Sequence, residues 1–136
     1  MYSQSELSQT IIDLVDDERG ILAADESHLT MAKRLQTIEV ESSEEKRRLW
    51  RSLLFGTKNL GQYISGVILF EETLTQKDGN QILLPQVAWQ QKIVPSIKVD
   101  KGTGPLSSAP GDLITRGLDG LSERLSRYKT QVARFA

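Results

Sequence analysis

The sequence predicts an α/β fold built on a parallel sheet. Short apolar runs, of the length expected for strands buried on both faces, alternate with longer segments whose apolar residues recur at three- and four-residue spacing. This alternation is typical of parallel strands joined by right-handed helical crossovers. Polar residues gather where the apolar runs end, which is the edge at which parallel α/β folds bind ligands.

Length and composition narrow the possible functions. The 136 residues suit one domain. Seventeen basic and eighteen acidic residues give a formal net charge of -1, so nothing indicates a nucleic-acid partner. Cysteine is absent, which excludes disulfides and thiolate metal sites. No apolar run reaches the ~18 residues of a membrane span, and no secretory signal is visible, so we expect a cytoplasmic protein.

A helix and a strand are predicted first. Residues 5–15 carry apolar side chains at helical spacing, which predicts a helix with one buried face. Residues 20–24 (GILAA) form the first apolar run, and a second helix is predicted over residues 30–38. Between them, Asp25, Glu26 and Ser27 follow the C-terminal end of the strand. Glu26 is expected to point away from a ligand bound by Asp25, because neighbouring strand residues face opposite sides.

A third helix is predicted by a capping box, in which Ser42 and Glu45 precede an amphipathic segment. Apolar spacing assigns one face of this helix to the core and the basic residues to solvent. The predicted buried face carries Leu49, Trp50, Leu53 and Leu54, and the predicted polar face carries Lys46, Arg47, Arg48 and Arg51.

The second half repeats the same pattern. Strands are expected over residues 63–70 and 93–99, with a helical turn over 72–76 and a helical segment over 86–91 between them. A loop rich in Gly, Ser and Pro, an amphipathic helix and the start of another apolar element follow, over residues 102–111, 117–132 and 133–136.

Six short blocks of sequence follow one another along the chain in a characteristic order. They are residues 20–27 (GILAADES), 32–36 (AKRLQ), 44–48 (EEKRR), 65–74 (SGVILFEETL), 97–102 (IKVDKG) and 117–124 (GLDGLSER). In this order and spacing they resemble the N-terminal part of class I fructose-bisphosphate aldolases, from about Leu7 to Ala136. One departure is His28-Leu29, where the family usually has a small Thr-Gly pair.

The resemblance implies a fold and a reaction. The fold is the N-terminal portion of a (β/α)8 TIM barrel, an N-terminal helix plus about three βα units, with residues 1–136 as one incomplete domain. The family of glycolysis and gluconeogenesis reversibly cleaves fructose 1,6-bisphosphate to dihydroxyacetone phosphate and glyceraldehyde 3-phosphate through a lysine Schiff base. It needs no metal or other cofactor, and its members are commonly tetramers.

The family's imine-forming lysine lies on a later strand. We therefore expect an active parent lyase and no activity from the 136 residues alone. An alternative is a non-catalytic aldolase-like protein that acts as a pseudoenzyme or an assembly partner.

The resemblance also assigns site residues, and each has a structural alternative. Asp25 matches a catalytic carboxylate beside the iminium ion, but it could instead cap the following helix. Lys98 matches a substrate-binding lysine, but it could be a solvated residue paired with Asp100. Ser27, Thr30 and Arg34 match a phosphate site, with a solvated basic helix face as the alternative. Arg47 matches a phosphate-binding arginine, but charge runs such as 46–48 are usually solvated.

Overall fold

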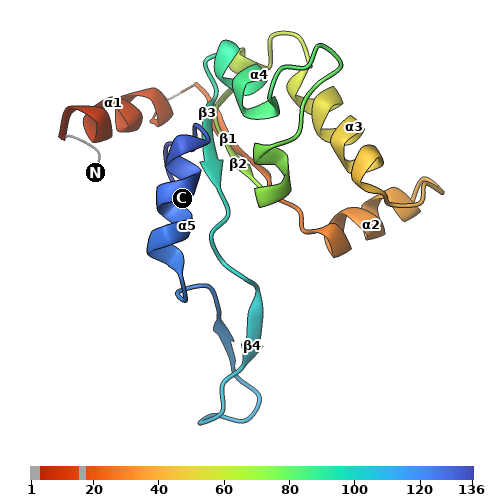
Figure 1. The fold of residues 1–136 in the computed structure, drawn as a ribbon, viewed down its shortest axis with the longest axis vertical. Helices are drawn as coiled ribbons and strands as arrows, with labels where there is room; N and C mark the ends of the chain where they lie inside the picture. The colour runs from red at the N-terminus through yellow and green to blue at the C-terminus, as the bar shows by residue number, and fades with distance from the viewer. Residues whose placement is uncertain (1–3, 16–17) are drawn as a thin grey trace.

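The computed structural model describes residues 4–15 and 18–136. Figure 1 shows the order of its elements. They are α1 (Gln4–Leu14), β1 (Gly20–Ala24), α2 (His28–Gln36), α3 (Glu44–Phe55), the 3-10 turn η1 (Leu60–Gln62), β2 (Ile64–Leu69), the 3-10 turn η2 (Glu71–Leu74), α4 (Leu84–Gln90), β3 (Val94–Ile97), β4 (Thr103–Pro105), β5 (Leu113–Thr115) and α5 (Leu121–Thr130).

The central sheet is parallel, as predicted. Its strand order is β1-β2-β3, and Val67 at its centre is in register with Leu22 on one side and Pro95 on the other. The segment 133–136 continues the pattern, because Phe135 forms a parallel bridge with Ser96 of β3. The predicted start of another apolar element is therefore confirmed as a segment paired with β3.

The core lies against the sheet, where α3, α4 and η2 cover it. Phe55 of α3, Leu74 of η2 and Ala88 of α4 pack with the strand residues Leu69 and Ile97, and all five are fully buried. Burying an apolar side chain of Leu, Ile or Phe size stabilises a fold by about 1.5–3 kcal/mol, so this cluster holds the strands in their register.

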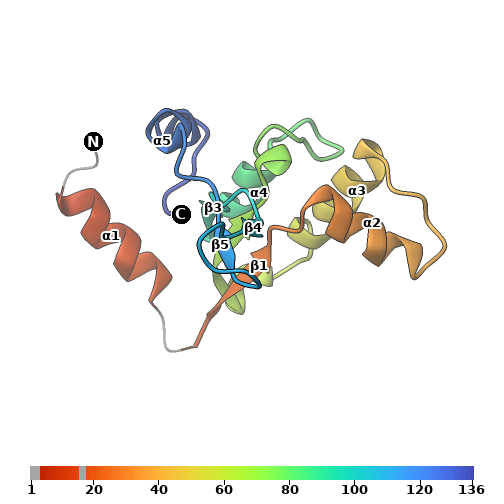
Figure 2. The same cartoon turned by 90° about the horizontal axis from the view of Figure 1, so that it is seen from below.

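The prediction that the apolar face of α1 is buried is wrong. Figure 2 shows α1 extending away from the sheet, and Ile12 is 66% exposed. The helix contacts the rest of the chain at the buried Thr10, whose hydroxyl accepts from Arg134 at 3.5 Å, and at Leu14, whose carbonyl accepts from the Ser65 hydroxyl at 2.8 Å. Apolar spacing predicted the helix correctly, but the face it marks contacts no other described element closely enough to be buried.

The faces predicted for α3 are correct only in part: Leu54 packs against the core and Lys46 is exposed, as predicted, but other positions differ. Leu53 is 73% exposed and Leu49 and Trp50 are exposed too, whereas Arg51 is 1% exposed. A guanidinium is buried at acceptable cost only when its donors are paired. Two nitrogens of the Arg51 guanidinium have such partners. Nη1 donates to the Glu72 carboxylate and Nη2 donates to the Glu26 backbone carbonyl, so the side chain turns inward.

Two helix starts differ from the prediction by one or two residues. Ser43, not Ser42, caps α3, and its hydroxyl accepts a hydrogen bond from the Lys46 backbone N–H at 3.2 Å. Helix α2 begins at His28 and not at residue 30, because Ser27 is its N-cap.

The segment after β3 contains a hairpin that the sequence did not reveal. Strands β4 and β5 pair antiparallel, with Thr103 opposite Thr115, and the hairpin projects away from the sheet (Figure 1). Three-residue strands are too short to show alternation. Helix α5 starts later than predicted, because Gly117 and Gly120 take positive φ angles of 128° and 64°.

We expect Gly61→Ala to lower the free energy of unfolding by about 1–3 kcal/mol. A Cβ at this position would lie 1.9 Å from the Gln91 carbonyl oxygen, which is backbone and cannot rotate away. Urea unfolding measures the effect. Gly79→Ala is the matched control, because a Cβ there meets nothing within 4 Å. Equal midpoints for the two variants would contradict the close approach of Gly61 to Gln91.

Candidate active site

A cavity of about 690 Å³ lies at the carboxyl ends of the three parallel strands. It is lined by residues that directly follow β1, β2 and β3, at the edge where the sequence predicts a ligand. Five of the six predicted site residues line it: Asp25, Ser27, Thr30, Arg34 and Lys98.

Asp25 and Lys98 face each other across the end of the sheet. The Lys98 ammonium lies 3.8 Å from an Asp25 carboxylate oxygen and donates a hydrogen bond to Asp100. The hydrogen bond to Asp100 is the main cause that raises the pKa of Lys98, and the charge of Asp25 adds to it. Lys98 is therefore protonated at neutral pH and presents a cation, not a free amine. Lys98 thus pairs with Asp100 and also lines the cavity, so the two predicted alternatives do not exclude each other.

Helix α2 begins directly at the cavity. The Ser27 hydroxyl accepts from the Thr30 backbone N–H at 3.3 Å, and the two hydroxyl oxygens lie 3.1 Å apart. Since Ser27 fills the N-cap position, Asp25 does not cap this helix, and the alternative structural role predicted for Asp25 is excluded. Asp25 keeps its carboxylate in the cavity wall.

Arg34 reaches the cavity from the same helix and forms an ion pair with Glu26. The Glu26 side chain is largely buried and lines the cavity, so the prediction that it points away is wrong. The strand ends at Ala24, and side-chain alternation does not continue past that residue.

Arg47 does not line the cavity. Its guanidinium donates to the Glu72 carboxylate, through Nη2 at 2.7 Å and Nε at 3.0 Å. The hydrogen bond to Glu72 raises the pKa of Arg47. Arg47 is therefore not a member of a solvated charge run, since only 12% of its side chain is exposed.

Glu72 is the centre of an ion-pair cluster that the sequence did not indicate. Besides Arg47, it accepts from Arg51 Nη1 at 2.5 Å, and His28 Nε2 lies 3.3 Å away. Burial acts to raise the pKa of Glu72, but the hydrogen bonds from Arg47 and Arg51 outweigh it and lower the pKa to about 2. Arg51 also donates to the Glu26 carbonyl at 3.2 Å, so the cluster joins the end of β1 to η2.

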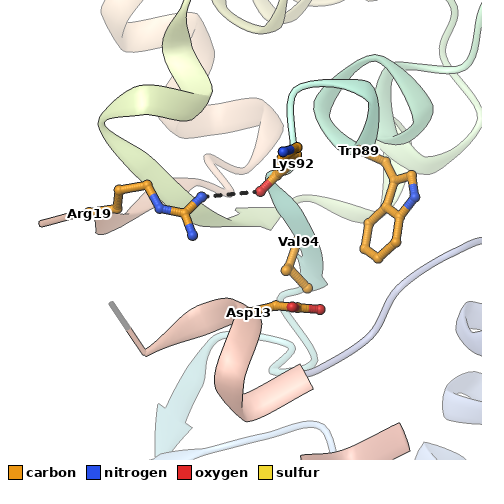
Figure 3. A pocket seen from close by; sticks show the side chains of 5 residues that line it. All are labelled: Asp13, Arg19, Trp89, Lys92 and Val94. Carbon is orange, nitrogen blue, oxygen red and sulfur yellow. Dashed lines mark hydrogen bonds between the residues drawn. The ribbon is translucent and has the colours of Figure 1, made fainter. Parts of the chain in front are cut away.

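A second cavity, of about 270 Å³, lies at the opposite, amino-terminal end of the strands. Figure 3 shows its lining, in which Arg19 donates to the Lys92 carbonyl at 3.5 Å beside Trp89 and Val94. Ligands of parallel sheets bind at the carboxyl ends of strands, so the candidate site is the other cavity.

Comparison with known proteins identifies the family. A family model described as glycolytic, fructose-bisphosphate aldolase class-I, matches residues 6–136. This chain belongs to the class I fructose-bisphosphate aldolase family. A probable class 1 aldolase of Xanthomonas campestris pv. campestris is 46% identical over 134 residues, and fructose-bisphosphate aldolase 1, chloroplastic, of Chlamydomonas reinhardtii is 50% identical over 131 residues. The matches cover 98% and 96% of this chain.

The fold agrees with a solved aldolase structure. A structure of Plasmodium falciparum fructose-bisphosphate aldolase, in complex with TRAP and a small-molecule inhibitor, has a TM-score of 0.93 and 47% identity over 97% of this chain. The α/β fold is therefore the N-terminal portion of the aldolase barrel. The chain spans 40% of the Xanthomonas relative, 35% of the Chlamydomonas relative and 38% of the Plasmodium chain.

The chain accommodates the His28-Leu29 pair inside helix α2. Both residues are helical, and Leu29 is not among the described residues with positive φ, so this position does not require glycine. The His28 ring packs edge-on against Phe70, with centroids 5.3 Å apart. Leu29 lines the cavity and adds apolar surface at its mouth.

No helix in the described ranges has both the length and the apolar character needed to cross a bilayer. Within the same ranges, no group of three or more His, Asp or Glu side chains is placed to hold a metal ion.

Proposed function

We propose that this chain is the N-terminal part of a class I aldolase that reversibly cleaves fructose 1,6-bisphosphate to dihydroxyacetone phosphate and glyceraldehyde 3-phosphate. The family match over residues 6–136 supports this proposal most strongly. The Asp25–Lys98 pair, with its 3.8 Å contact at the carboxyl edge of the sheet, supplies a carboxylate and a fixed cation where a sugar phosphate would enter.

Each of the five predicted site residues that line the cavity has a proposed role. Asp25 is the catalytic residue, whose carboxylate contacts the iminium ion and the sugar hydroxyls. Lys98, protonated, binds substrate through a hydroxyl or phosphate oxygen. Ser27, Thr30 and Arg34 bind a phosphate beside the start of α2, where the positive end of the helix dipole favours an anion.

Arg47 is proposed as a further phosphate ligand. Because Glu72 holds its guanidinium in the described structure, this role requires Arg47 to exchange one anionic partner for another.

The proposed parent works by a lysine Schiff base in glycolysis and gluconeogenesis, in the cytoplasm, as a homotetramer without metal or other cofactor. The near-neutral charge supports the expectation that nucleic acid is not a partner. We propose that residues 1–136 form one incomplete domain, inactive alone. The exposed apolar side chains of α1 and α3 support this view, since an isolated domain normally buries such faces. The alternative, a non-catalytic partner protein, is less well supported, because Asp25 and Lys98 are in place.

The function is tested on the product of the complete reading frame beyond codon 136. We expect release of triose phosphates from fructose 1,6-bisphosphate in a spectrophotometric assay, and none from residues 1–136 assayed in parallel. A complete product that folds but releases no triose phosphate would contradict the proposed function.

We expect no covalent adduct when residues 1–136 are incubated with fructose 1,6-bisphosphate and borohydride. An imine forms when a neutral amine attacks the ketone and water is lost, and hydride then reduces it to a stable secondary amine. Lys98, the lysine closest to Asp25, is held protonated by its carboxylate neighbours. Intact mass spectrometry reads the result, and a stoichiometric adduct would show that the chain does contain an imine-forming lysine.

A further inference from the structure

The basic side chains of the cavity wall are each held by a carboxylate. Arg34 pairs with Glu26, Lys98 with Asp100, and Lys101 with Glu71. Three basic residues therefore face four acidic ones, Asp25, Glu26, Glu71 and Asp100, along this wall. A phosphate that enters the cavity must compete with these carboxylates for its ligands.

Glu71 differs from the other carboxylates because it engages two cations from two separate segments. One of its oxygens lies 3.2 Å from the Lys101 ammonium, and the other accepts from the guanidinium of Arg127 in α5. Burial acts to raise the pKa of Glu71, but Lys101, Arg127 and the nearby Tyr128 hydroxyl outweigh it and lower the pKa. Glu71 is thus ionised at neutral pH.

Both cations held by Glu71 are more than half exposed. The side chains of Lys101 and Arg127 are 52% and 55% exposed, so their alternative positions cost little desolvation. Exposed ion pairs of this kind contribute little to stability, whereas a phosphate can take several charge-assisted hydrogen bonds from the same donors. The balance between carboxylate and phosphate is therefore close, and the charge of Glu71 decides it.

We propose that Glu71 sets the phosphate affinity of the cavity by withholding Lys101, which lines the cavity, from the ligand. The ligand class is a phosphate monoester or free phosphate. The inference rests on the proposed function in one respect, namely that this cavity receives a phosphate group. It adds Glu71, just after the end of β2, as a residue that determines ligand affinity. No role was assigned to Glu71 above.

Glu71→Gln tests the proposal by removing the charge while keeping the size of the side chain. We expect the dissociation constant for inorganic phosphate, measured by titration calorimetry at low ionic strength on the product of the complete reading frame, to fall about 3- to 10-fold. The double variant Glu71→Gln/Lys101→Met should lose most of that gain. Glu45→Gln is the matched control, because Glu45 pairs with Arg48 on α3, outside this cavity, and should leave the constant unchanged.

The outcomes separate the proposal from the function on which it rests. Triose phosphate release by the wild type with an unchanged or weaker phosphate constant for Glu71→Gln would overturn the role of Glu71 alone. Absence of triose phosphate release would overturn the proposed function, while the phosphate titration still decides the role of Glu71. If no sample binds phosphate, the role of Glu71 is overturned as well.

A single variant keeps the proposal falsifiable even if Glu71→Gln fails to fold. Lys101→Met alone should change phosphate affinity less than about twofold, because Glu71 already neutralises Lys101. A loss as large as that of Lys98→Met would make Lys101 an ordinary ligand and overturn the proposal.

Discussion

Glu72→Gln lowers the free energy of unfolding by about 3–5 kcal/mol, the largest stability change that we expect from this chain. The substitution leaves the Arg51 guanidinium, which is 1% exposed, without its carboxylate partner. It also deprives Arg47 of its carboxylate partner. Arg51 then no longer links Glu72 of η2 by an ion pair to the Glu26 carbonyl that follows β1. Urea unfolding at pH 7 measures the loss.

Glu45→Gln serves as the control for this prediction. The Glu45–Arg48 pair lies on the surface of α3, and Glu45 is 60% exposed. Surface pairs of this kind contribute little to stability, so the control should unfold close to the wild type. Equal losses for Glu72→Gln and Glu45→Gln would show that the Glu72 cluster does not stabilise the fold.

The effect of Glu72 depends on pH in a defined direction. Its pKa is lowered from the ordinary 4.5 to about 2 in the folded chain, so its contribution is complete above about pH 4.5 and is lost as the pH falls toward 2. The difference in unfolding free energy between wild type and Glu72→Gln should therefore shrink steadily over that interval. A difference that stays constant down to pH 2.5 would mean that another group carries the effect.

Asp25→Asn should lower kcat for fructose 1,6-bisphosphate cleavage by about 10²- to 10⁴-fold in the product of the complete reading frame. The amide keeps the shape of the side chain but cannot accept a proton, and it removes the negative charge 3.8 Å from Lys98. Asp119→Asn, at an exposed position outside the cavity, is the control and should keep wild-type turnover. If Asp25→Asn retains kcat within about threefold, Asp25 does not move protons in the proposed reaction.

Strands β2 and β3 were predictable because they are largely buried on both faces. The apolar run 20–24 also forms a strand, but the expectation that it is buried on both faces is wrong, since Ile21 is 52% exposed. The expected segments 20–24, 63–70 and 93–99 contain β1 (Gly20–Ala24), β2 (Ile64–Leu69) and β3 (Val94–Ile97), the last of which is shorter than predicted. The strand over residues 64–69 can be predicted without knowing what packs against it, because an apolar segment of that length bounded by polar turns favours a buried strand. The parallel arrangement then follows from the helices between the strands.

The orientation of the helices was not predictable in the same way. Arg51 was assigned to the polar face of α3 because arginine is usually exposed, yet it is buried. Its partners, Glu72 and the Glu26 carbonyl, lie 21 and 25 residues away and meet it only after the strands have paired. Local spacing contains no information about such a contact.

The candidate site, too, was predictable only where local sequence is sufficient. Asp25 and Lys98 could be placed at one edge because each lies at the C-terminal end of a predicted parallel strand. Glu71 also follows a strand, but its neighbour Glu72 is equally acidic, and the sequence does not say which of them faces the cavity. The structure separates them, since Glu71 lines the cavity and Glu72 pairs with Arg47 and Arg51 behind it.

The strand order bears on how the chain folds while it is being synthesised. Strand β1 pairs with β2, β2 pairs with β3, and Phe135 adds its segment beside β3. Each pairing in this sheet thus joins a strand to the one made just before it. Because a ribosome delivers the N-terminal part first, each new strand and helix can dock on a surface that has already emerged, and the sheet grows in the direction of translation.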